Sequence, residues 1–165
     1  MAIQPADIVY RLSGGTSNGT AAASVGGAKS TTVVAPGALF DTIDGTESSV
    51  GDIEYRCVYV HNAHPTLTMQ NAMAWIPTNT PNTGTDMAIG VGSSAINGTE
   101  QSVANEGTAP AGVTFAVAGT LGAGVALGNI PPGQHRAVWL RRTVTAAAPA
   151  SNDGCTLRAT CDTAA

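Results

Sequence analysis

Residues 52–76 read Asp-Ile-Glu-Tyr-Arg-Cys-Val-Tyr-Val-His-Asn-Ala-His-Pro-Thr-Leu-Thr-Met-Gln-Asn-Ala-Met-Ala-Trp-Ile, and this stretch decides the fold class. Both ends are rich in β-branched, aromatic and long apolar residues, which favour extended strands. Side chains of a strand alternate between its faces, so Tyr55, Cys57 and Tyr59 share one face, and Arg56, Val58 and Val60 the other. The break at His64-Pro65 is typical of a turn, because proline cannot continue a strand ladder. The stretch therefore predicts a β-hairpin.

Further short strand patterns follow along the chain, separated by Gly, Pro, Asn and Asp. We expect strands at Asp7–Ser13, Ser30–Ala35, Asp86–Val91, Val113–Val117, Val125–Ile130, Gln134–Val144 and Cys155–Cys161. No window shows convincing helical periodicity, and about eight to ten short strands at this spacing are typical of sandwiches and barrels. The sequence predicts an all-β chain, with residues 1–165 forming a single β-sandwich domain of jelly-roll or immunoglobulin-like type.

Residues 14–29 consist almost throughout of Gly, Ser, Ala and Thr. Such a composition offers little surface to bury. We expect a flexible arm or a long loop, mobile in the isolated subunit and ordered against a neighbour.

The composition restricts the classes of partner. Charged residues make up 11% of the 165 residues, less than half of the roughly 25% typical of soluble domains. A surface so poor in charge suits a chain packed against copies of itself or a larger partner. Seven Lys and Arg residues with a net charge of −4 argue against nucleic acid as the main partner. The uncharged run 108–134 is broken by Gly and Pro, which argues against a membrane span, and the first residues lack the pattern of a secretion signal.

Three cysteines are an odd number for a disulfide framework. Cys155 and Cys161 fall on one expected strand, which separates them by about 20 Å and prevents their pairing. Either could face Cys57 across a core, but three small buried thiols are the favoured interpretation.

Motifs for chemistry are weak. His61 and His64 flank a strand end and a proline, where side chains do not converge on a metal. The run Asp41–Glu47 resembles a fragment of a calcium loop but lacks the spacing of an EF-hand, so a solvated turn is the better interpretation. We expect no catalytic residues, no cofactor and no metal site, and the chain is predicted not to be an enzyme.

Arg136, Arg141 and Arg142 are the most informative charges. Alternation on the expected strand puts Arg136 and Arg142 on one face and Arg141 on the other. One interpretation is a docking patch for acidic residues of a neighbouring subunit. The other is an edge strand that uses charge to prevent aggregation.

Four runs resemble a known family. They are Tyr55-Arg-Cys-Val-Tyr-Val-His-Asn62, Asn97-Gly-Thr-Glu-Gln101, Ala109-Pro-Ala-Gly-Val-Thr-Phe115 and Ile130-Pro-Pro-Gly-Gln-His-Arg-Ala-Val-Trp-Leu-Arg-Arg-Thr143. They look like small virion proteins of tailed bacteriophages, and most like capsid decoration (cement) proteins, over Asp7 to Asp162.

The resemblance implies a small β-rich structural protein that binds the outside of a shell of major capsid protein as a homo-oligomer, within a virion assembled in the host cytoplasm. Many weak contacts on a lattice add through multivalency. Tail, neck and baseplate proteins use similar sandwiches, so the alternative is a surface- or carbohydrate-binding module of a tail, neck or host-adhesion apparatus.

Overall fold

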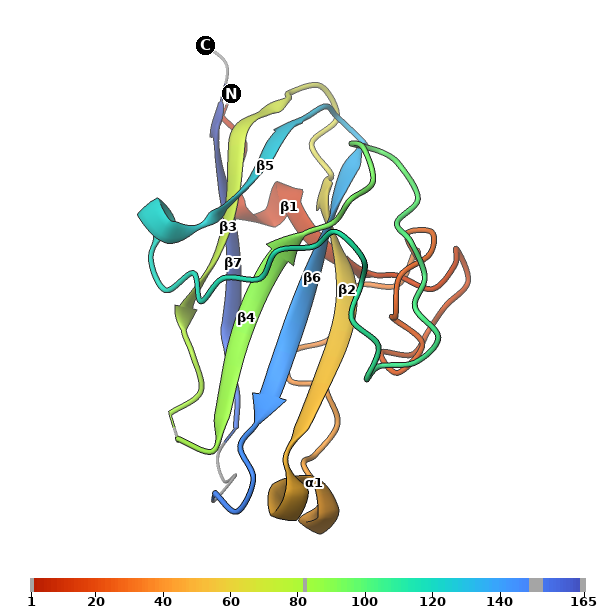
Figure 1. The fold of residues 1–165 in the computed structure, drawn as a ribbon. Coiled ribbons are helices and arrows are strands. Elements are labelled where there is room, and N and C mark those ends of the chain that lie inside the picture. The colour runs from red at the N-terminus through yellow and green to blue at the C-terminus, as the bar shows by residue number, and fades with distance from the viewer. Residues whose placement is uncertain (1, 82, 149–152, 164–165) are drawn as a thin grey trace.

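A computed structural model describes residues 2–81, 83–148 and 153–163. Seven strands form two antiparallel sheets, which confirms the predicted all-β sandwich (Figure 1). The elements in chain order are η1 (Pro5–Asp7), β1 (Ile8–Leu12), α1 (Gly45–Val50), β2 (Asp52–Asn62), β3 (Met69–Thr78), β4 (Thr85–Val91), η2 (Leu121–Ala123), β5 (Val125–Ile130), β6 (His135–Val144) and β7 (Thr156–Thr163). One sheet has the order β1-β2-β6-β4 and the other the order β5-β3-β7.

The predicted hairpin between the two halves of residues 52–76 is wrong. β2 pairs with β1 and β6, whereas β3 pairs with β5 and β7 in the opposite sheet. The Asn62 side-chain amide donates to the carbonyls of Leu67 and Ile130, 2.8 Å from each, so the link is a fixed corner that crosses between sheets. Both edges of β2 are occupied, and crossing lets the apolar faces of β2 and β3 cover each other.

The predicted alternation of faces is confirmed, but both faces of the four-stranded sheet are buried. Val58 and Val60 point into the sandwich, in the core that also contains Trp75. On the other face Tyr55, Cys57, Tyr59 and Trp139 form a second core. Trp75 and Trp139 are both buried, but in separate cores, because alternation on β6 turns Trp139 outward.

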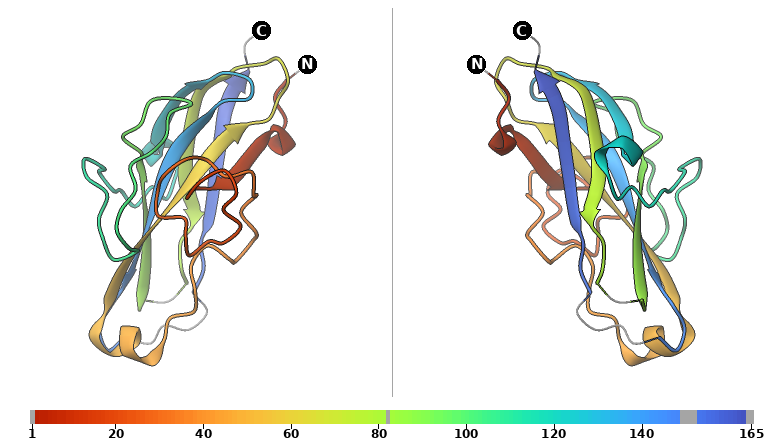
Figure 2. Two further views of the ribbon diagram at one scale, coloured as in Figure 1. Left: turned by 90° about the vertical axis from the view of Figure 1, so that its right-hand side faces the viewer. Right: turned by 90° about the vertical axis from the view of Figure 1, so that its left-hand side faces the viewer.

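Two long loops cover the outer face of this sheet, and Figure 2 shows them flanking it. One loop contains residues 14–29 and the other runs from β4 towards η2. The hydroxyl of Tyr59 donates to the Gly27 carbonyl at 2.6 Å and accepts from the Glu100 amide at 2.9 Å, so it joins both loops. The amide of Cys57 donates to the Ser24 carbonyl at 2.7 Å. The segment 14–29 is therefore a long loop held on the sheet, and the structure shows no free arm there.

The strand count is lower than expected because two segments form isolated bridges instead of ladders. In the expected strand Ser30–Ala35, Val33 forms a bridge with Arg11 of β1. In the expected strand Val113–Val117, Ala116 forms a bridge with Ile89 of β4. The solvated turn predicted at Asp41–Glu47 contains the start of α1. Asp44 accepts from the amides of Thr46 and Glu47, and the Glu47 carboxylate accepts from the Asp44 amide, which forms a capping box.

The described residues form no helix with the length and apolarity needed to cross a membrane. All three cysteines are free thiols. Cys57 is buried as expected, whereas Cys155 and Cys161 are only partly buried.

Candidate functional site: a groove along β7 and a buried arginine cluster

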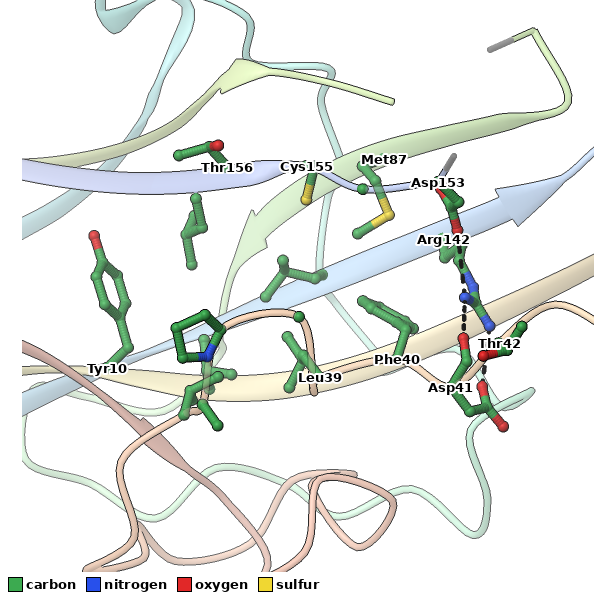
Figure 3. Close-up of a pocket in the computed structure, with 18 of the residues that line it drawn as sticks. Tyr10, Leu39, Phe40, Asp41, Thr42, Met87, Arg142, Asp153, Cys155 and Thr156 are labelled. Atoms are coloured by element: carbon green, nitrogen blue, oxygen red, sulfur yellow. Dashed lines mark hydrogen bonds and ion pairs between the residues drawn. The ribbon is translucent and has the colours of Figure 1, made fainter. Parts of the chain in front are cut away.

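A cleft of about 680 Å³ opens between the inner face of the four-stranded sheet, the loop of residues 34–43 and the start of β7. Val58, Met87 and Leu140 line its sheet side. Leu39, Phe40 and Cys155 project into it from the loop and from the segment before β7, as Figure 3 shows. The cleft is largely apolar, and its polar groups gather at the end where Arg142 lies.

A second cavity of about 620 Å³ lies farther along β7, beneath the N-terminal residues. Both cavities are bordered by Tyr10 of β1 and Leu157 of β7. Burial raises the pKa of Tyr10, and a hydrogen bond with the backbone of Ala159 partly offsets that rise. The two cavities thus form one groove between β1 and β7, with the Tyr10 ring as the division. We call it the β7 groove.

The groove is the open side of the inner core. Eleven partly buried hydrophobic residues pack against that core, and nine of them line the groove. The nine are Ile3, Ile8, Tyr10, Val34, Leu39, Phe40, Cys155, Leu157 and Cys161. The partly exposed apolar surface of the inner core is therefore concentrated beside β7.

Arg142 is the centre of the polar end of the groove. Its guanidinium pairs with the carboxylate of Glu54, with Asp41 at 3.0 Å and with Asp153 at 3.5 Å. It also lies 5.0 Å from the centre of the Phe40 ring. One arginine thus faces three carboxylates, and the cluster carries a net negative charge when all are ionised. Burial raises the pKa of Glu54 to about 7, although Arg142 pulls it the other way.

The three arginines singled out by the sequence do not form one patch. Arg142 is buried in the sandwich, whereas the Arg141 guanidinium lies on the outer face, 5.4 Å from the centre of the Phe115 ring. The side chain of Arg136 donates to the carbonyl of Ser94. Arg136 and Arg141 remain partly exposed, and their docking role stays a prediction. The edge-strand interpretation is wrong, because β6 lies between β2 and β4.

Both histidines considered as metal ligands have local structural partners. Nδ1 of His64 accepts from the amides of Thr66 and Leu67. Nδ1 of His61 accepts from the side chain of Arg11 at 3.3 Å. Each ring thus helps to fix the turn or strand next to it.

One group of described residues has the spacing of a cation site. Glu47, Asp52 and Glu54 each have a carboxylate oxygen within 4.8 Å of the others. Gly51, with φ of 82°, turns the chain from α1 into β2 and so brings Glu47 to the strand. The run Asp41–Glu47 does not reveal this set in the sequence, because Asp52 and Glu54 join Glu47 only through that turn. Glu54 is already paired with Arg142, and no function follows from the set alone.

Comparison with protein families, with curated proteins and with solved structures finds no match to this chain.

Proposed function

We propose that this chain is a non-enzymatic structural protein of a tailed-bacteriophage virion, which decorates and stabilises the capsid shell by binding the major capsid protein and copies of itself. The resemblance of the four runs described above to capsid decoration proteins supports this proposal. The observation that carries it is the distribution of charge on the folded chain.

Charge is about as scarce on the folded surface as the composition indicates. Four of the 18 charged side chains are buried, namely Glu54, Arg56, Glu100 and Arg142. Several large aliphatic side chains are exposed, namely Val33, Val50, Ile53, Val117 and Leu121. Burying such a surface against a neighbour incurs little charge desolvation, so a modest contact can be net favourable. Repetition over a lattice then adds the contributions of many subunits.

The alternative is a carbohydrate- or surface-binding module. The placement of the aromatic residues argues against it. Sugar-binding faces usually present rings to solvent, and the chain has seven aromatic residues. Four of them are buried and the other three are partly buried, so none offers an open stacking platform.

The test compares phage particles that contain and lack the protein. We expect particles without it to release DNA at a lower temperature, and purified protein to restore the original temperature. Leu121→Lys and Val50→Lys place a charge on exposed aliphatic positions, and we expect at least one to weaken this rescue. Ser49→Lys is the matched control, because Ser49 is exposed beside Val50 on α1. Particles that are equally robust without the protein but fail to attach to cells would overturn the proposal in favour of adhesion.

A further inference from the structure

We propose that the β7 groove is an acceptor site for an extended segment of a partner protein, which adds to the free edge of β7 as a fourth strand of the smaller sheet. The segment would carry apolar side chains at alternate positions and a basic residue that meets Asp41 and Asp153. This surface differs from the exposed aliphatic positions above, and the inference stands without the capsid proposal.

The sandwich is closed on one side and open on the other. On the closed side β4 contacts both β5 and β3. On the open side β1 and β7 are not among the strand pairs in close contact in the described part of the chain, and the two cavities lie between them. Four strands therefore face three, and the missing position is the one next to β7.

The outer edge of β7 has backbone groups available for a ladder. Along its eight residues β7 pairs with β3 alone in the described structure, and an antiparallel strand turns every second amide and carbonyl to each side. Among the described residues, hydrogen bonds on the groove side come from two single groups, the Tyr10 hydroxyl at the backbone of Ala159 and the Ile3 amide, which donates to Thr163 Oγ1 at 3.1 Å. An entering strand would replace such isolated contacts with continuous pairing.

Side chains of such a strand would find apolar space on one face. Cys155, Leu157, Ala159 and Cys161 alternate along the segment and pack against the inner core. Each cavity falls within the roughly 300–1,000 Å³ of protein binding pockets. A period of two in the segment would match this wall, because alternate side chains of a strand point to the same face.

The carboxylates around Arg142 determine which side chain of the segment can bind at that end of the groove. Arg142 is already surrounded by Glu54, Asp41 and Asp153. The side chains of Asp41 and Asp153 are 64% and 20% exposed, so an incoming group can reach them. The excess of negative charge favours a cationic side chain and disfavours an acidic one.

The direct test uses the full chain and a synthetic nine-residue peptide in which Val alternates with Thr between two terminal Arg residues. We expect binding, measured by fluorescence anisotropy, together with slower amide hydrogen exchange along β7. A peptide of the same composition with its Val residues adjacent should bind at least about ten-fold more weakly, a difference that anisotropy resolves easily. A peptide with terminal Glu residues should also bind more weakly.

Variants of the groove locate the binding. Leu157→Trp fills the wall shared by the two cavities and should reduce affinity about ten-fold or more. Leu121→Trp is the matched control, because Leu121 is exposed on η2 outside both cavities and should leave affinity unchanged. Asp41→Asn should weaken binding of the peptide with terminal Arg residues. The affinity for the peptide with terminal Glu residues should not fall. If Leu157→Trp does not fold, hydrogen exchange on the unaltered chain decides the question alone.

Two results would overturn the inference. The first is an absence of peptide binding up to about 1 mM, together with unchanged hydrogen exchange along β7 when the peptide is joined to the C-terminus of the full chain. A Gly-Ser linker makes this joint and supplies an effective peptide concentration in the millimolar range. The second is binding of decyltrimethylammonium in the cleft without any response to the peptides, which would make the groove a pocket for small amphiphiles.

Discussion

Glu54 and Arg142 stand directly opposite each other on β2 and β6, and their side chains form an ion pair inside the sandwich. The two side chains are 1% and 3% exposed. Oε1 of Glu54 has no hydrogen-bond partner among the described residues, so the ion pair leaves part of the carboxylate's desolvation uncompensated. This pair connects the interior of the fold to the acidic end of the β7 groove.

Removal of one partner should cost more stability than removal of both. Arg142→Met leaves Glu54 buried without its counterion, and we expect a loss of about 3–5 kcal/mol in the free energy of unfolding at pH 8. The double variant Glu54→Leu/Arg142→Met should recover most of that loss, because aliphatic side chains of similar volume need no compensation. Urea unfolding of both variants measures the difference. Equal losses in the single and double variants would contradict this account of the pair.

Ionisation of Glu54 should make the protein less stable as the pH rises. Burial raises the pKa of this carboxyl from 4.5 to about 7, so the folded state holds its proton more tightly than the unfolded state. The resulting stabilisation is full below pH 4.5 and is lost as the pH rises through 7, by about 1–2 kcal/mol once solvent screening is allowed for. Unfolding measured at pH 5 and pH 8 should show this fall in the original chain and a much smaller one in Glu54→Gln. An equal fall in Glu54→Gln would assign the effect to another group.

Sequence patterns predict the local part of this fold well. The alternation in residues 52–62 and 134–144 gives both the strands and the side chains that share a face, because a period of two depends only on strand geometry. The turn at Pro65 is also present, but a turn signal does not say whether the next strand pairs with the previous one or crosses to another sheet. That choice depends on β1 and β6, which occupy both edges of β2 and come from distant parts of the chain.

These sequence patterns do not predict the β7 groove. Its two walls come from Tyr10 and Leu157, which lie near opposite ends of the chain, and neither side chain belongs to a motif. Arg142 was identified as a notable charge, but its partner Glu54 emerges only from the register between β2 and β6. The composition of residues 14–29 predicts a flexible arm or a long loop, because small residues bury little. Their hydrogen bonds to the sheet and to the neighbouring loop, such as that from the Gly27 amide to the Glu100 carbonyl, could not be read from composition.

The loop of residues 14–29 should be protected from hydrogen exchange in the isolated chain. Tyr59→Phe removes the hydroxyl that bonds Gly27 and Glu100, and we expect a loss of about 1–2 kcal/mol with faster exchange in both outer loops. Gly26→Ala should be at least as disruptive. Gly26 has φ of 94°, and an added Cβ would lie 1.8 Å from the Gln101 carbonyl oxygen. Gly37→Ala is a control with the same kind of backbone strain but no close neighbour. Rapid exchange throughout residues 14–29 in the unaltered chain would restore the free-arm hypothesis.

Trp75 and Trp139 should act as independent anchors, because they lie in separate cores on opposite sides of the four-stranded sheet. Trp139→Ala should cost about 3–5 kcal/mol and loosen the outer loops, since its ring packs in the same core as partly buried Val103 and Phe115. Trp75→Ala should cost a similar amount but accelerate exchange in β3 and β7 instead.

Because two alanine replacements together could exceed the whole stability of a domain, the additivity test uses Trp75→Phe and Trp139→Phe. We expect the double variant to lose the sum of the two single losses within about 0.5 kcal/mol, as distant sites do. If the loss in the double variant differs from that sum by much more than about 0.5 kcal/mol, the two tryptophans belong to one continuous core. The sheet between them would then not separate the two layers as the structure indicates.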